Sequence, residues 1–214
     1  MLKYISYLYP ITRQVKSKYS DTLEITWYNG KKHLNTKNAN YSYGSLQAIL
    51  KFGLDKIDLK QINSILLLGL GGGSVIETLR QDFNYQKQIT AIDIDPVIID
   101  IAKTEYQLEN NANTTIICED ALQFIKNNTS TFDLIIIDLF IDIKVPKPFL
   151  ELSFWENVIT SKSTNGVLLF NASLEEKKSY QLQTVIDFLK TKVYKVDVYE
   201  NVNDTNTVII SQSL

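Results

Sequence analysis

Four of the five residues from 69 to 73 are glycine, and they follow directly on the apolar run 65–68. Glycine has no Cβ, so this turn can adopt backbone angles that other residues avoid and can let a ligand come close to the main chain. A helix that starts after such a turn adds its free N–H groups. Ser74 stands where the dinucleotide fingerprint G-x-G-x-x-G requires its last glycine. We therefore expect a ligand-binding turn, with a tight turn that binds nothing as the alternative.

Three aspartates, Asp93, Asp120 and Asp138, each follow an apolar run further along the chain. The carboxyl ends of parallel strands meet at one edge of a sheet, where ligands of such sheets bind. A carboxylate at the end of the second strand, where Asp93 stands, can accept hydrogen bonds from both hydroxyls of a ribose. The pattern indicates a nucleoside-type ligand. The simpler role of Asp120, as of Asp95, is to cap the helix that follows.

The elements that must position these side chains alternate between apolar runs and segments of helical periodicity. Unbroken Ile, Leu and Val runs that alternate with helices are typical of a parallel sheet buried on both faces. The last two expected strands are separated by too few residues for a crossover, so they should run antiparallel. The sequence thus predicts a doubly wound α/β fold, whose seven-stranded sheet is mostly parallel with an antiparallel C-terminal hairpin strand. The expected strands are 64–70, 88–94, 114–119, 132–140, 166–172, 193–200 and 206–212, and the expected helices are 74–83, 95–108, 121–128, 153–162 and 178–192.

The residues before 64 follow a different pattern. Residues 21–36 alternate apolar and polar side chains around Asn29-Gly30, a pair that suits a tight hairpin turn. Residues 41–56 have helical spacing, with Gly53 as the expected end of the helix. We expect a small N-terminal β-hairpin element in residues 1–42, followed by a binding domain with its leading helix in residues 43–214.

Composition narrows the class of protein. The 214 residues are 44% hydrophobic and 21% charged. The sequence has no apolar run of the roughly 20 residues that a membrane span needs, and it has no signal-peptide pattern. We therefore expect a cytoplasmic protein without a membrane partner. The basic residues of the N-terminal segment are scattered, and we expect no nucleic-acid partner. His33 has no companion ligands in the sequence, so no metal site is predicted. Cys118 is expected as a small apolar residue of a buried strand.

Four segments, 64–79, 89–103, 116–125 and 132–140, resemble the nucleoside-binding motifs of the spermidine synthase-like family in order and spacing. This family comprises spermidine synthases and related methyltransferases of the class I S-adenosylmethionine-dependent methyltransferase fold. Residues 30–50 are similar to its small N-terminal β domain and to the gate segment that carries a tyrosine. The resemblance covers most of the chain. It implies S-adenosylmethionine or its decarboxylated form as cofactor, a small-molecule acceptor and a homodimer.

The resemblance also implies roles for single residues. The glycine turn would receive the methionine-derived part of the cofactor, the acid after the second strand would hold the ribose, and the acid after the third would meet the adenine amino group. The catalytic residues that it implies are Asp138, beside the transferred group, and Tyr43, in the gate segment. Packing of a helix onto the sheet is the alternative role for Tyr43 and Gln47. The implied cofactor-binding residues are Gly69, Gly71, Gly73, Asp93, Ile94, Asp120, Ala121 and Gln47.

Two departures from the family pattern bear on the reaction. Aminopropyltransferases carry a GGGDGG-like turn and a DSSDP-like segment, whose acids hold the aminopropyl chain and the polyamine. This chain has Gly72 in place of the turn's acid and Ile141 in place of the second acid of DSSDP, with Asp142 one residue further on. Each lost charged contact is worth roughly 1.5 to 3 kcal/mol, which weakens recognition of a polycation. Asn38 or Asn40 could serve for the family's cofactor-contacting glutamine.

We therefore expect methyl transfer from S-adenosylmethionine to an unidentified small acceptor, for which an amine is one candidate. Asp138 would orient the amine or take its proton, with Tyr43 second in this role. Asn171 is either a wall of the acceptor site or a turn residue at the end of a strand. Two alternatives stay open: an aminopropyltransferase that uses decarboxylated S-adenosylmethionine and a polyamine, and a nucleoside-binding protein with little catalytic activity.

Overall fold

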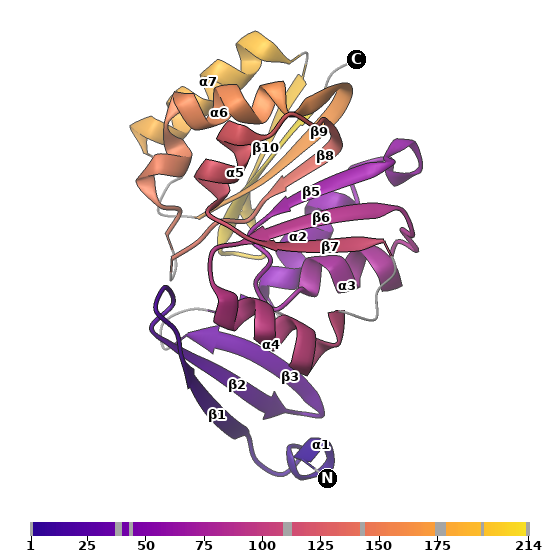
Figure 1. Cartoon of the computed structure of the whole chain (residues 1–214), viewed down its shortest axis with the longest axis vertical. Helices are drawn as coiled ribbons and strands as arrows, with labels where there is room; N and C mark the ends of the chain where they lie inside the picture. The colour runs from indigo at the N-terminus through magenta and orange to yellow at the C-terminus, as the bar shows by residue number, and fades with distance from the viewer. Residues whose placement is uncertain are drawn as a thin grey trace.

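The chain forms two β-sheets that differ in size and in the direction of their strands (Figure 1). The computed structural model describes residues 2–36, 40–42, 45–108, 113–141, 144–173, 179–193 and 195–212. Within these residues, no helix has the length and the apolar character that crossing a bilayer requires.

The larger sheet has seven strands in the order β10-β11-β9-β8-β5-β6-β7. Strands β5 to β9 run parallel, whereas β11 runs antiparallel to both of its neighbours, β9 and β10. The predicted doubly wound α/β fold with an antiparallel C-terminal hairpin strand is thus confirmed. The strands are β5 (Ser64–Leu68), β6 (Gln88–Asp93), β7 (Thr114–Cys118), β8 (Phe132–Ile137), β9 (Lys162–Ser173), β10 (Lys195–Val202) and β11 (Asn206–Gln212).

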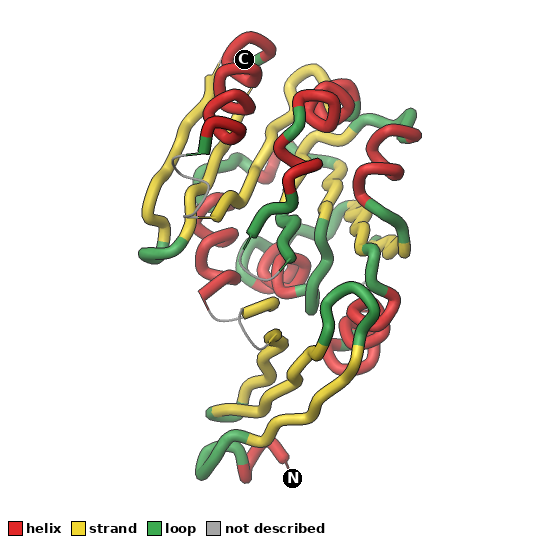
Figure 2. Tube along the Cα trace, turned by 90° about the vertical axis from the view of Figure 1, so that its left-hand side faces the viewer, coloured by secondary structure: helices red, strands yellow, loops and turns green. Residues whose placement is uncertain are grey.

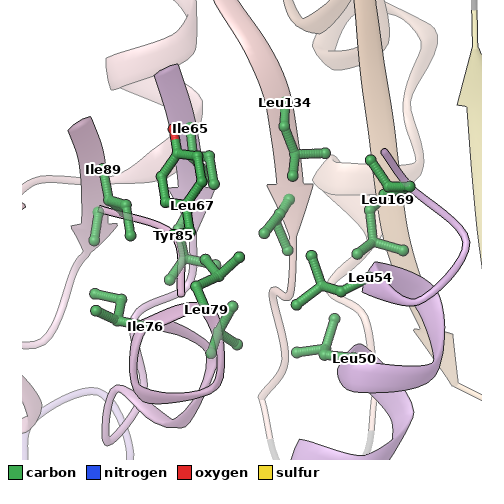
Figure 3. Close-up of a cluster of buried hydrophobic side chains, with 14 of the residues drawn as sticks. Leu50, Leu54, Ile65, Leu67, Ile76, Leu79, Tyr85, Ile89, Leu134 and Leu169 are labelled. Atoms are coloured by element: carbon green, nitrogen blue, oxygen red, sulfur yellow. The ribbon is translucent and has the colours of Figure 1, made fainter. Parts of the chain in front are cut away.

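Helices cover both faces of this sheet (Figure 1). Side chains of successive residues in a strand point to opposite faces, so Ile65 and Leu67 of β5 enter one buried cluster, while Leu66 and Leu68 enter another. Both clusters are apolar, which explains why the strand is an unbroken apolar run. Figure 3 shows the first cluster, in which Leu54 and Leu79 from two helices face the sheet. The helices are α2 (Ser45–Leu54), α3 (Ser74–Gln81), α4 (Pro96–Tyr106), α5 (Ala121–Asn127), α6 (Leu152–Thr160) and α7 (Tyr180–Lys192), with short 3-10 helices at η1 (Leu59–Gln61) and η3 (Lys147–Leu150).

Strand β7 is an edge strand, and its side chains are only partly covered. The expectation that Cys118 is buried was wrong, because this residue ends β7 and is exposed. A central position in the sheet would have buried it, but the sequence of the strand does not reveal that β7 has a neighbour on one side only.

The smaller sheet has four antiparallel strands in chain order, β1 (Ile11–Lys16), β2 (Thr22–Tyr28), β3 (Lys31–Thr36) and β4 (Asn40–Ser42), after a short helix α1 (Leu2–Ile5). The predicted turn at Asn29-Gly30 joins β2 to β3, and both residues have positive φ, 48° and 74°. The hairpin is therefore confirmed. It is the middle of a larger element, because β1 and β4 extend it on either side.

Helix α4 lies between the two sheets (Figures 1 and 2). Its residues Ile99 and Ala102 belong to a cluster of the larger sheet, whereas Ile98 and Ile101 pack against the smaller one. The smaller sheet contributes the buried side chains Leu23, Ile25 and Leu34. Because α4 follows the strand that carries Asp93, this packing places the smaller sheet next to the edge where the candidate site lies.

Candidate functional site

The glycine turn joins β5 to α3 and contains three residues with positive φ: 93° at Gly69, 53° at Gly71 and 86° at Gly73. A Cβ at position 69 would overlap with the main-chain carbonyl oxygen of Asp138. A Cβ at position 73 would overlap with the side chain of Leu108. The packing of the chain itself therefore favours glycine at positions 69 and 73, with or without a ligand.

Asp93 ends β6, and its carboxylate ties this strand to the glycine turn. Oδ2 accepts a hydrogen bond of 3.1 Å from the backbone N–H of Gly71, and Oδ1 accepts one of 2.9 Å from the backbone N–H of Asp95. The side chain is half-buried. Burial raises the pKa of Asp93 to about 6, and the backbone hydrogen bonds limit the rise. Further hydrogen-bond donors from a ligand would stabilise the charged form of the Asp93 carboxylate.

Asp95 is a structural residue, as its predicted helix-capping role requires. It is 1% exposed, and its Oδ1 accepts a hydrogen bond of 3.0 Å from the N–H of Val97 in the first turn of α4. Its other oxygen, Oδ2, accepts hydrogen bonds from the hydroxyls of Ser17 and Ser20, the latter at 3.0 Å. Both serines belong to the turn between β1 and β2. The turn of the smaller sheet is thus hydrogen-bonded to Asp95, whose backbone N–H donates to Asp93.

Asp138 follows β8 directly, and its half-buried carboxylate accepts a hydrogen bond of 2.9 Å from Nδ2 of Asn171. Burial raises the pKa of Asp138 to about 6, while the hydrogen bond from Asn171 opposes the rise. Asn171 is fully buried, so it is neither an exposed wall nor a turn residue in this structure. The residues after Asp138 are apolar: Leu139 and Phe140 are half-buried, and Ile141 is 60% exposed.

The third acidic residue, Asp120, accepts a hydrogen bond of 2.8 Å from the N–H of Leu122 and so caps α5. Ala121, next to it, is buried. Ile94 follows Asp93 and is 39% exposed, which leaves an apolar surface beside the carboxylate. The implied adenine and ribose contacts of these residues stay predictions.

The gate segment is only partly described. Gln47 on α2 donates a hydrogen bond of 2.9 Å from Nε2 to the hydroxyl of Thr78 on α3, so here it joins two helices, and its cofactor role stays a prediction. Tyr43, Asn38 and Asp142 lie outside the described residues. Within the ranges that the structure does describe, no three His, Cys, Asp or Glu side chains are grouped as metal ligands.

Sequence reasoning missed three side chains at this edge: Ser17, Ser20 and Asn206. The serines lie some 75 residues or more from Asp95 in the chain, and Asn206 donates a hydrogen bond of 2.8 Å to Oδ1 of Asn171. None of them belongs to a motif. Only the packing of the two sheets and the position of β11 bring them to the site.

Comparison with known proteins identifies the family of the chain. The model of the spermine/spermidine synthase domain family matches residues 49–205. A polyamine aminopropyltransferase of Sulfolobus acidocaldarius is 30% identical over 167 residues, which are 72% of this chain and 51% of the relative. An eEF1A lysine and N-terminal methyltransferase of Danio rerio is 30% identical over 130 residues, 56% of this chain and 19% of that protein.

A solved structure with the same fold is human methyltransferase-like protein 13 in complex with SAH. It aligns with a TM-score of 0.62 at 21% identity, covering 79% of this chain and 80% of that one. The chain covers only 51% and 19% of the length of the two curated relatives, and these two relatives are named for different reactions. Because the family model matches most of its length, this chain belongs to the spermine/spermidine synthase domain family.

Proposed function

We propose that the chain is a spermidine synthase-like transferase that binds S-adenosylmethionine and transfers its methyl group to an amine. The observation that carries the choice of reaction is the segment after β8, where Asp138 is followed by three apolar residues rather than by further acids. Membership of the family supports a transferase, and its relatives include both aminopropyltransferases and methyltransferases.

The residues at the carboxyl edge fit the nucleoside part of such a cofactor. Asp93 presents a half-buried carboxylate whose pKa is raised, so additional hydrogen-bond donors would stabilise its charged form. The two ribose hydroxyls supply such donors. Ile94 offers an exposed apolar side chain next to it, which suits the face of a base. Gly71, bonded to Asp93, keeps the turn close to this carboxylate.

The apolar segment argues against a polycationic substrate. The family pattern expects an acid at position 141, and the isoleucine there is 60% exposed. An exposed apolar side chain offers no compensation to an ammonium group, whereas each lost charged contact costs about 1.5 to 3 kcal/mol of binding. The aminopropyl group of decarboxylated S-adenosylmethionine and a polyamine both carry ammonium groups. S-adenosylmethionine with a less charged acceptor is therefore the better match.

An amine acceptor fits both Asp138 and the names of the relatives. S-adenosylmethionine would supply a methyl group that its sulfonium makes electrophilic, and the sulfur would leave as a neutral thioether when its bond to this carbon breaks. Asp138 would align the attacking nitrogen and accept the proton that it loses, and a carboxylate with a pKa of about 6 is a better proton acceptor than an ordinary aspartate. A lysine and a protein N-terminus, the acceptors in the name of the methyltransferase relative, both react through an amine nitrogen and carry less charge than a polyamine.

Calorimetric titration of the purified protein tests the cofactor. We expect S-adenosylmethionine to bind more tightly than its decarboxylated form, NADH not to bind, and Asp93→Ala to weaken binding of S-adenosylmethionine by at least tenfold. Asp100→Asn, an exposed aspartate on α4, is the control and should leave the affinity unchanged. Tight binding of NADH would refute S-adenosylmethionine as the cofactor, and unchanged affinity in Asp93→Ala would refute the proposed ribose contact.

Transfer of a labelled methyl group to putrescine, spermidine and a lysine-containing peptide then tests the reaction. The second candidate, aminopropyl transfer, is supported by the aminopropyltransferase relative and would be established by a preference for the decarboxylated cofactor together with an aminopropylated product. Cofactor binding without a labelled product from any amine would favour the third candidate, a nucleoside-binding protein with little activity.

A further inference from the structure

Three polar side chains form a row across neighbouring strands at the carboxyl edge of the larger sheet. Asn206 on β11 donates a hydrogen bond of 2.8 Å from Nδ2 to Oδ1 of Asn171 on β9. Asn171 in turn donates one of 2.9 Å from Nδ2 to Oδ1 of Asp138, which follows β8. Asn206 reaches this edge because β11 runs antiparallel, so that its first residue lies where the parallel strands end.

The charge on Asp138 fixes the direction of both hydrogen bonds. An ionised carboxylate only accepts hydrogen bonds, so the amide of Asn171 must turn its NH₂ group toward Asp138. Its carbonyl oxygen then faces Asn206, which must donate. Asn171 is fully buried, and either amide in the opposite orientation would leave buried groups without partners.

This arrangement leaves one oxygen of Asp138 available. Among the residues that the structure describes, only Asn171 donates a hydrogen bond to this carboxylate, and it donates to Oδ1. The carboxylate is half-buried rather than enclosed. We call Asn206, Asn171 and Asp138 the relay. Oδ2 of Asp138 can therefore accept a hydrogen bond from a group outside the relay while Oδ1 accepts the one from Asn171.

We propose that Asn171, oriented by Asn206, is a positioning residue that holds the carboxylate of Asp138 with Oδ2 toward the acceptor. The role in transfer rests on the proposed function, whereas the coupling of the three side chains does not. The C-terminal hairpin thereby contributes to the site through Asn206, without contacting the substrate.

A carboxyl-carbon NMR titration of the protein without cofactor or acceptor tests this coupling. The variants Asp138→Asn and Asp93→Asn identify the carboxyl-carbon resonances of Asp138 and Asp93, because each variant lacks one of the two. In Asn171→Leu the carboxylate loses the donor that favours its charged form, so the pKa of Asp138 should rise by about one unit. Asn206→Leu frees the amide of Asn171 to turn, and a smaller rise in the same direction is expected.

The pKa of Asp93 serves as the internal reference, because in the described part of the chain its carboxylate accepts hydrogen bonds from the backbone of Leu70, Gly71 and Asp95 and from none of the three relay residues. Asn157→Leu, on α6, is the matched control and should move neither pKa; its amide bonds to the backbone of its own helix. An unchanged pKa of Asp138 in Asn171→Leu, or equal shifts of Asp93 and Asp138 from a general loosening, would overturn the proposal. If Asn171→Leu does not fold, Asn206→Leu decides in the same way. Either result is independent of whether methyl transfer is ever observed.

Discussion

Asp138→Asn is predicted to stabilise the protein at neutral pH while abolishing the proposed methyl transfer. The asparagine side chain keeps an oxygen that can accept the hydrogen bond from Asn171, so the relay at this edge survives. What disappears is the negative charge of the half-buried carboxylate. Since burial disfavours the charged form, removing the charge should raise the free energy of unfolding.

The size of this effect follows from the pKa of Asp138, which burial raises from 3.8 to about 6. Because the folded pKa lies above the unfolded one, the folded state binds more protons between these values, and stability is lost as the pH rises through this window. Each pKa unit corresponds to 1.36 kcal/mol, so the charge costs about 3 kcal/mol at pH 7.5. At pH 4.5 most folded molecules hold the proton, and the cost falls to about 1 kcal/mol.

Urea unfolding of the wild-type protein and of Asp138→Asn at both pH values measures the difference directly. The variant should be more stable by about 3 kcal/mol at pH 7.5 and by about 1 kcal/mol at pH 4.5. Asp187→Asn, an exposed residue of α7, is the control and should change stability by less than about 0.5 kcal/mol at either pH. A variant no more stable than the wild type at pH 7.5, or an advantage that does not change with pH, would refute the assignment of a destabilising charge to Asp138.

Three further predictions follow from the same edge of the sheet. Cys118, the one cysteine of the sequence, is exposed beside Asp93 in the strand register, so saturating S-adenosylmethionine should slow its reaction with a thiol reagent severalfold; an unchanged rate would contradict the nucleoside position. Gly69→Ala should lower the free energy of unfolding by about 2 kcal/mol or more, because residue 69 has a positive φ and its Cβ would overlap with the carbonyl oxygen of Asp138. Gly72→Ala should lower it by less, because the φ of Gly72 is not positive. Equal losses in the two variants would count against this reason. Replacing Ser17 and Ser20 together by alanine removes two donors from the buried carboxylate of Asp95 and should cost about 2 to 3 kcal/mol in urea unfolding, whereas a stability equal to wild type would mean that the smaller sheet does not support Asp95.

The strands of the larger sheet could be predicted because they are buried on both faces. Ile65 to Leu68 point alternately into two apolar clusters, so the whole run had to be apolar, and the helices between the runs followed from their own periodicity. Asp95 and Pro96 marked the start of α4 for equally local reasons. Local chemistry decides these features, and the sequence displays it.

Strand order and side-chain partnership are decided by contacts that the sequence does not display. The sequence indicated an antiparallel pair at the C-terminus but not that β11 would lie between β9 and β10, and this position alone brings Asn206 to Asn171. The exposure of Cys118 depends likewise on the edge position of β7. The contact of Ser17 with Asp95 joins two sheets through a turn that carries no motif.

The structure also changes which residues argue for a ligand. Glycine at positions 69 and 73 is accounted for by the carbonyl of Asp138 and the side chain of Leu108, so a glycine-rich turn by itself is weak evidence of binding. The two carboxylates are different, because burial raises the pKa of both Asp93 and Asp138 to about 6, and each is therefore a net cost to folding at neutral pH. An asparagine at position 138 would avoid that cost and still accept the hydrogen bond from Asn171, whereas at position 93 it would offer one acceptor oxygen to two backbone N–H groups. Packing does not explain a charge that destabilises the fold. A binding or catalytic role does explain it, at the edge where such sheets bind their ligands.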